Sequence, residues 1–130
     1  MKTNGKRNRS AGHKLERDLV KLFKKAGFTH TVTTRSESKS RDDQKVDLMN
    51  KNEYENGRLP YNVQAKTSTS HLSYAKILSE LPETKDVVNV IIHRQTTKVG
   101  ERFLRRGEYA ILNLNDFMKI IKELNEKRTS

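Results

Sequence analysis

The chain of 130 residues contains no cysteine and no tryptophan. The absence of cysteine excludes disulfide bonds, thiolate metal sites and a cysteine nucleophile, and it is typical of proteins from the reducing cytoplasm. With 6% aromatic residues in total, a surface of stacked aromatic rings for binding bases is not expected. These absences direct the search for function towards charged and amide side chains.

Long hydrophobic runs are missing as well. No stretch of about 18 apolar residues occurs, so we expect no transmembrane helix and no membrane partner. The first ten residues, MKTNGKRNRS, are basic and lack the apolar segment of a secretory signal, which predicts a cytoplasmic protein. Hydrophobic residues make up 32% of the chain, enough for one small core. We therefore expect a flexible basic arm at residues 1–10 and one domain at residues 11–127.

The net charge is strongly positive. Lys and Arg total 27 and Asp and Glu total 16, which gives a formal charge of +11. The excess is uneven, because residues 1–25 contain nine basic and two acidic side chains. Such a charge predicts a polyanionic partner, with nucleic acid as the first candidate. Binding of the amphipathic first helix to a membrane surface is the alternative.

Hydrophobic periodicity predicts three helices and five strands. The expected helices span residues 11–26, 71–81 and 115–126, and the expected strands span residues 28–34, 46–50, 60–66, 87–93 and 109–114. The order α, β, β, β, α, β, β, α predicts an α/β protein with a single mixed central β-sheet flanked by helices.

Four further features of this pattern are predicted. Residues 35–45 have no apolar side chain and are expected to form a polar loop. Residues 94–107 are expected to form a basic excursion between the last two strands. The strand at 87–93 is the most apolar and is expected to be central. The apolar stripe of the last helix, with Ile120, Ile121 and Leu124, is expected to pack in the core.

Polar side chains are embedded in two of the predicted strands. Gln64 and Lys66 lie on the same side of their strand because side chains alternate. If the strand that contains Asp47 pairs with theirs as a hairpin, an aspartate, an amide oxygen and an ammonium group converge. Asp47 and Gln64 offer hard oxygen ligands that suit Mg²⁺ or Mn²⁺, and Glu16 on the first helix could reach the same ion. Lys66 could bind a phosphate or help to deprotonate a water. The alternative is an ordinary solvent-facing side of a soluble sheet.

A family resemblance is carried by short segments along most of the chain. These segments are Gly12-His13-Lys14-Leu15-Glu16-Arg17-Asp18-Leu19-Val20, Ala26-Gly27-Phe28, Thr34-Arg35-Ser36, Val46-Asp47-Leu48 and Val63-Gln64-Ala65-Lys66-Thr67. The chain resembles the archaeal-type Holliday junction resolvases, a branch of the PD-(D/E)xK nuclease superfamily. Members of that family begin with a basic arm and a helix containing Glu-Arg-Glu-Leu-Val, followed by Val-Asp-Leu and Glu-Val-Lys-Thr motifs.

The resemblance implies a fold and an activity. The fold would be the αβββαβ core of restriction-endonuclease-like proteins. The activity would be metal-dependent, structure-selective cleavage of four-way junctions or related branched DNA by phosphodiester hydrolysis. Mg²⁺ would be the cofactor, with Mn²⁺ as a substitute. The protein would be a symmetric homodimer in the cytoplasm of a prokaryotic or phage-infected cell.

The resemblance also assigns roles to individual residues. The implied catalytic residues are Glu16, Ser36, Asp47, Gln64 and Lys66, of which Glu16, Asp47 and Gln64 would bind the metal. Ser38 matches the family's loop serine as well as Ser36 does. Gln64 departs from the family, which has Glu at this position. The amide removes one negative charge and should weaken metal affinity.

Basic residues near these positions are the predicted DNA contacts. They are Lys6, Arg7, Arg9, Lys14, Arg17, Arg35, Lys39, Arg41 and Lys45. They would contact phosphates, so affinity would depend on branch shape more than on base sequence. The segment at 35–45 is either a DNA-gripping flap or a solvated loop. Asp42 and Asp43 in it could bind a metal, but a solvated acidic pair is favoured because no apolar residue anchors the segment.

Two other function classes remain open. One is a nuclease-fold module that binds DNA with weak or no catalysis, and the other is an RNA- or ribosome-associated structural protein. Cleavage that requires a metal would distinguish a nuclease from the DNA-binding module. Preference for duplex RNA over a four-way DNA junction would instead indicate the RNA- or ribosome-associated protein.

Overall fold

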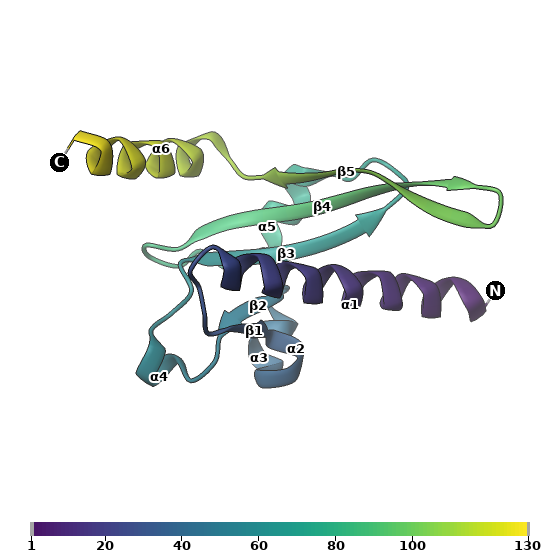
Figure 1. The fold of residues 1–130 in the computed structure, drawn as a ribbon, viewed down its shortest axis with the longest axis horizontal. Coiled ribbons are helices and arrows are strands. Elements are labelled where there is room, and N and C mark those ends of the chain that lie inside the picture. Colours follow the sequence, from purple (N-terminus) through teal and green to yellow (C-terminus); the bar gives the residue numbers. More distant parts are fainter. Residues whose placement is uncertain (1, 130) are drawn as a thin grey trace.

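The structure, a computed structural model, describes residues 2–129, with side chains from Arg9 onward. Figure 1 shows a long first helix beside a twisted sheet, with short elements below and a last helix that projects from one end. In chain order the elements are α1 (Lys2–Lys25), β1 (Thr31–Thr33), α2 (Thr34–Glu37), α3 (Lys39–Asp43), β2 (Leu48–Asn50), α4 (Glu53–Asn56), β3 (Tyr61–Ser68), α5 (Tyr74–Glu80), β4 (Val88–Val99), β5 (Arg102–Ile111) and α6 (Leu114–Thr129).

The strands form two sheets. In the larger sheet the order is β3-β4-β5, with β3 parallel to β4 and β4 antiparallel to β5. The parallel pair is joined through α5, since parallel neighbours need a crossover connection. The smaller sheet is the antiparallel pair of β1 and β2. The predicted mixed α/β fold, with a mixed sheet flanked by helices, is confirmed, although the strands are divided between two sheets. The predicted central strand at 87–93 corresponds to the first part of β4, which begins at Val88.

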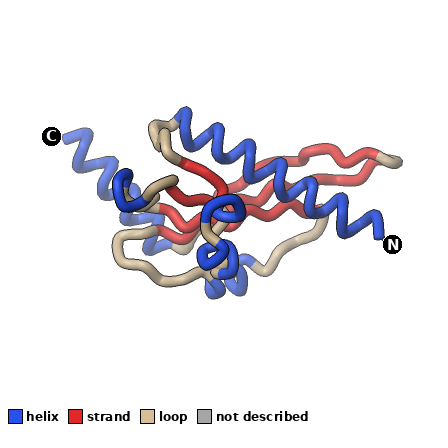
Figure 2. The backbone as a smooth tube through the Cα atoms, turned by 90° about the horizontal axis from the view of Figure 1, so that it is seen from below, coloured by secondary structure: helices blue, strands red, loops and turns tan. Residues whose placement is uncertain are grey.

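The core lies between α1 and one face of the larger sheet. Leu15 and Leu19, four residues apart on α1, are buried against Val63 of β3 and Val90 of β4. Figure 2 shows α1 running along the sheet. Gly27 ends the α1 region with a φ of 114°, which glycine adopts without steric cost. The residues that recur at helical spacing in the sequence are thus the residues that hold α1 on the sheet.

Two segments contain more regular structure than predicted. Helix α1 begins at Lys2 instead of residue 11, so it includes residues that were expected to form a flexible arm. The prediction of a loop at residues 35–45 was wrong, because most of this segment forms α2 and α3. Buried Thr34 donates a hydrogen bond to the carbonyl of Val46, and Ser38 caps α3 by accepting from the backbone N–H of Arg41. These polar contacts order a segment that has no hydrophobic side chain.

The expected excursion at 94–107 is also regular. Strand β4 continues to Val99 and β5 begins at Arg102, so the two strands form one long hairpin. Its two-residue turn contains Gly100 with a φ of 61°, the left-handed backbone that tight hairpin turns require.

The prediction that the α6 stripe belongs to the core was wrong. No residue of α6 is buried, and Phe117, Met118, Ile121 and Leu124 are exposed. The reason is the direction of the helix, which leaves the end of β5 and extends beyond the sheet (Figure 1). Of the stripe, Ile120 is half-buried.

No helix within residues 2–129 is long and apolar enough to cross a lipid bilayer.

Candidate functional site

Asp47 lies directly before β2 and contacts the middle of β3. Its backbone N–H donates to the carbonyl of Val63 at 2.7 Å. Its Oδ2 atom accepts hydrogen bonds from the backbone N–H of Ala65 at 2.7 Å and from Nε2 of Gln64 at 3.1 Å. The predicted hairpin of β2 with β3 was wrong, because β2 pairs with β1. The predicted proximity of Asp47 and Gln64 is nevertheless found, since Asp47 itself bonds to β3.

The environment of Asp47 favours its neutral form. The side chain is only 9% exposed, and burial raises the pKa of Asp47 to about 7, with the charges of Glu16 and Asp42 adding to the increase. The hydrogen bond from Ala65 and the charge of Lys66 act in the opposite direction on this pKa. A buried carboxyl group with a pKa raised so far is a feature of functional sites, and a bound cation would favour its ionised form.

Gln64 and Lys66 lie on the same face of β3, as strand alternation requires. Gln64 is buried, whereas Lys66 is half-buried. The amide nitrogen of Gln64 contacts Asp47, so the amide oxygen is not the atom directed to that carboxylate. Rotating the amide by half a turn would exchange the two atoms and present the oxygen as a ligand.

Glu16 on α1 acts on the site through its charge. Its Oε1 atom lies 3.2 Å from Nε of Arg35 on α2, and its charge is close enough to raise the pKa of Asp47. Within the described part of the chain there is no group of three or more His, Asp or Glu side chains that could hold a metal ion. The predicted ligand set has two carboxylates and one amide. The two carboxylates are hard oxygen donors, which suit Mg²⁺ or Mn²⁺, whereas the amide of Gln64 presents its nitrogen to Asp47.

The two candidate serines differ in their bonding. Ser38 Oγ caps α3, which gives this hydroxyl a structural role. Ser36 is exposed on α2, where its Oγ donates to the carbonyl of Thr33 at 2.9 Å. It is adjacent in the chain to Arg35, the partner of Glu16. Of the two serines, Ser36 is the one whose hydroxyl has no capping role.

The predicted DNA contacts fall into three groups. The structure does not describe the side chains of Lys6 and Arg7. Exposed side chains are found at Arg9, Lys14, Arg17, Arg35, Lys39 and Lys45. Arg41 is instead bound to Glu53 through two hydrogen bonds of 3.0 and 2.6 Å, so its guanidinium group holds α3 to α4. Asp42 and Asp43 are exposed, and the charge of Asp42 acts on Asp47.

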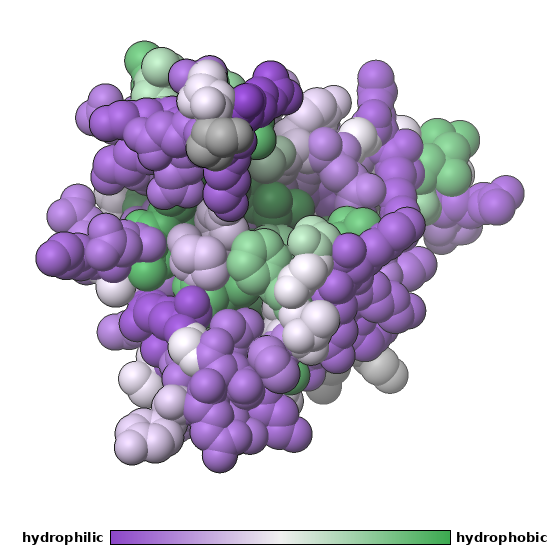
Figure 3. Space-filling model, turned by 60° about the vertical axis from the view of Figure 1, so that its left-hand side comes forward, coloured by the Kyte–Doolittle hydropathy of each residue, from purple (hydrophilic) through white to green (hydrophobic). Residues whose placement is uncertain are grey.

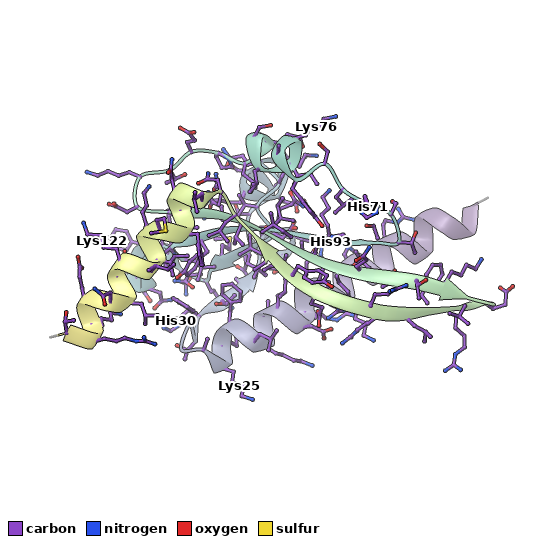
Figure 4. The ribbon with its side chains drawn as sticks, turned by 90° about the horizontal axis from the view of Figure 1, so that it is seen from above. Lys25, His30, His71, Lys76, His93 and Lys122 are labelled. Carbon is purple, nitrogen blue, oxygen red and sulfur yellow. The ribbon has the colours of Figure 1, made fainter. Side chains whose placement is uncertain are left out.

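A buried histidine lies in the strand next to Lys66. His93 on β4 is paired in register with Lys66 and is 1% exposed. Its Nε2 lies 3.0 Å from Oγ of Ser68, and its Nδ1 lies 2.8 Å from the hydroxyl of Tyr74. Burial and the charge of nearby His71 lower the pKa of His93. Figure 4 labels both histidines. Both ring nitrogens have partners in the neutral form, so the ring joins β4 to the end of β3 and to α5.

A second polar cluster that sequence reasoning missed joins α1 to the sheet. Arg94 on β4 is 5% exposed, and its Nη2 lies 2.9 Å from Oδ2 of Asp18 and 2.8 Å from Oε2 of Glu108. The only signal in the sequence was an arginine directly after the most apolar strand. Its partners, 76 and 14 residues away along the chain, could not be identified from spacing.

Comparison with protein-family models, with curated proteins and with solved structures finds no match to this chain.

Proposed function

We propose that this protein is a metal-dependent, structure-selective endonuclease that cleaves four-way junctions or related branched DNA by phosphodiester hydrolysis. The observation that carries the proposal is the buried contact between Asp47 and Gln64, with Lys66 on the same face of β3. The charge of Glu16 acts on the same carboxyl group from α1. The chain thus combines two carboxylates, an amide and an ammonium group with a net charge of +11.

Each residue has a role that follows from its position. Glu16, Asp47 and the rotated amide of Gln64 would hold Mg²⁺ or Mn²⁺. When bound, the ion supplies Lewis acidity for the scissile phosphate and the attacking water. Lys66 places a positive charge where negative charge develops on the phosphate in the transition state. Burial of Asp47 keeps these interactions strong because water does not screen them.

A second candidate function is a DNA-binding module without cleavage. It is favoured by the hydrogen bond in which the amide nitrogen of Gln64 donates to Asp47, because this bond gives the carboxyl group a partner without a metal. In that case the pair would be a structural contact between β3 and the segment before β2. DNA would then bind equally well in the presence and absence of a divalent cation.

The deciding experiment is incubation of the protein with labelled four-way junction, linear duplex and splayed DNA in Mg²⁺, Mn²⁺ or EDTA. Cleavage of branched substrates that requires a metal supports the proposal. Binding to the junction without cleavage in any metal supports the module. Preference for duplex RNA, included as a fourth substrate, would contradict both. Asp86→Asn, in the exposed loop before β4, serves as a control for loss of a carboxylate elsewhere.

The proposal includes a homodimer, and its support is an uncovered hydrophobic recess. The recess has a volume of about 370 Å³ and is lined entirely by apolar and aromatic side chains, among them Phe23 of α1, Val90 of β4 and Leu112 after β5. Figure 3 shows a recess lined with hydrophobic residues between hydrophilic surfaces. Ile120 of α6 lines it as well, so α6 contributes one apolar side chain to the recess.

The occupant that we propose for this recess is α6 of a second copy. A helix of this length depends mainly on packing of its apolar face, yet no residue of α6 is buried. Within the described residues, each copy therefore presents a mostly exposed apolar face on α6 and an apolar recess. A two-fold exchange of α6 would cover both surfaces in both copies and leave neither exposed. It would also supply the two active sites that symmetric cleavage of a junction requires.

A further inference from the structure

Strands β4 and β5 continue well beyond the edge of the three-stranded sheet. Strand β3 ends at Ser68, which pairs with Gln95, so from Thr96 to Arg106 only β4 and β5 pair with each other. We call this two-stranded segment, residues 96–106, the basic ribbon. Figure 1 shows it projecting from the body of the protein, and Figure 4 shows side chains extending outward along it. An isolated two-stranded hairpin is only marginally stable in water, so its length needs a reason.

The surface of the basic ribbon is cationic and partly apolar. The ribbon has four exposed basic side chains and one acidic side chain. The basic residues are Lys98, Arg102, Arg105 and Arg106, and the acidic residue is Glu101. Near the turn, Val99, Phe103 and Leu104 are also exposed, at 56%, 43% and 45%. Exposed hydrophobic side chains grouped at the tip of a projecting element indicate a surface for binding.

The strand register distributes these groups over both faces of the ribbon. Lys98 pairs with Phe103 on one face, where the ammonium nitrogen lies 5.9 Å from the ring centroid. Val99 pairs with Arg102 on the other face. Each face therefore presents a cation next to an apolar side chain. A ribbon that packed against its own domain would have one apolar and one polar face, so the pattern favours a ligand that surrounds the ribbon.

The base of the ribbon is firmly attached to α1. Arg94 contacts both Asp18 and Glu108 just before the ribbon begins, and Arg105 lies 3.4 Å from the same Asp18 carboxylate. An irregularity in the register between Gln95 and Thr96 marks the point where the ribbon leaves the sheet, and such bulges increase the local twist. The ribbon is thus held in a defined direction by ion pairs centred on the buried Arg94, whose acidic partners are partly exposed.

We propose that the basic ribbon is a second DNA-binding element, which enters a groove of a duplex arm of the substrate; the proposal rests on the proposed function for its ligand. The major groove of B-DNA accepts a two-stranded β-ribbon. Basic side chains on both faces would contact the phosphates on the two sides of the groove. Phe103 and Leu104 at the tip would contact apolar edges of the bases or sugars. None of the DNA contacts predicted from the sequence lies in this ribbon.

The experiment measures binding of a labelled four-way junction by fluorescence anisotropy in EDTA, where no cleavage occurs, over a range of salt concentrations. The test variant is Lys98→Gln/Arg102→Gln/Arg106→Gln. The matched control, Lys51→Gln/Lys76→Gln/Lys85→Gln, removes the same charge from exposed sites outside the ribbon, one of them on α5 (Figure 4). Each lost phosphate contact should reduce the log–log salt slope by about 0.9, so the test variant should lose about 2.7 and the control nothing.

A second variant separates the tip from the charges. Phe103→Ser/Leu104→Ser should weaken binding several-fold at every salt concentration and leave the slope unchanged. The inference is overturned if the triple ribbon variant keeps the wild-type slope, or if the control loses as much as the ribbon variant. Wild-type protein that fails to bind any DNA would instead overturn the proposed function. If the wild-type protein cleaves DNA and both ribbon variants bind DNA as tightly as the wild type, only the proposed role of the ribbon is overturned.

Discussion

The side-chain amide of Gln64 donates a hydrogen bond of 3.1 Å to Oδ2 of Asp47, and both residues are buried. The same oxygen also accepts from the backbone of Ala65 at 2.7 Å. One carboxylate oxygen is thereby fixed by β3. The contact holds the candidate site together without a metal, and it also places the amide nitrogen where a metal ligand should present an oxygen. Variants of these residues therefore distinguish a catalytic site from a structural contact.

Replacement of Asp47 or Lys66 should stop cleavage without stopping DNA binding. Asp47→Asn removes the buried charge that would hold the metal, and Lys66→Ala removes the charge that would act on the phosphate under the proposed function. We expect each to lower the cleavage rate by about 100-fold or more, with junction affinity in EDTA unchanged because the other basic residues remain. Asp86→Asn should cleave at the wild-type rate. Cleavage by either site variant at the rate of that control would refute the assignment.

Gln64 should respond to substitution in a metal-dependent way. Gln64→Glu places a second carboxylate beside Asp47 and removes the donor at 3.1 Å. Without metal, repulsion between two carboxylates about 4 Å apart amounts to about 4 kcal/mol at an effective dielectric constant of about 20, so stability should fall until one of the pair takes up a proton. With metal, the added charge should lower the Mg²⁺ concentration for half-maximal cleavage by about tenfold.

Gln64→Leu is the companion variant, since it removes the amide at similar bulk. It should raise the required Mg²⁺ concentration or stop cleavage. Metal titrations of cleavage for the wild type and both variants, with melting temperatures in EDTA and Mg²⁺, measure these effects. Coincident titration curves for all three proteins would mean that Gln64 only holds β3 to Asp47.

The Asp18–Arg94 contact should make stability depend on pH in the acid range. The hydrogen bond and charge of Arg94 hold the pKa of Asp18 below its usual range. Because the folded-state pKa is lowered, the stabilisation is present at neutral pH and is lost as pH falls below the unfolded value of about 3.9. Asp18→Asn should cost about 1 kcal/mol at pH 7, since the pair is partly exposed, and little at about pH 3. Urea unfolding at the two pH values measures this; an equal loss at both would show that the charge of Asp18 contributes nothing.

The stripe of α6 should control the oligomeric state. Wild-type protein should be a dimer by light scattering coupled to size-exclusion chromatography. Ile121→Ser/Leu124→Ser should shift it to a monomer, because both side chains are exposed on α6 in a single copy. Lys119→Ser/Glu126→Ser, on the opposite side of the helix, should remain dimeric. A wild-type monomer at all concentrations would show that the recess is not filled by a second copy.

The sequence by itself determined the main helix and the central strand. Leu15 and Leu19 recur at helical spacing, and residues 87–93 form the most apolar run; both became core elements. Such local patterns are sufficient because a helix face or a buried strand is defined by residues close together in the chain. The sequence also identified Asp47, Gln64 and Lys66 as a group, because strand alternation places the last two on one face.

Only the tertiary structure decided what these elements contact. The partner of β2 is β1 and not β3, and pairing between strands depends on contacts that no local pattern contains. Periodicity showed which side of α6 is apolar, but what covers that side depends on the direction in which the helix leaves β5. The same holds for the basic ribbon, which is exposed because β3 ends at Ser68. Burial of Asp47, and with it the raised pKa, arises because distant segments exclude water from one carboxyl group.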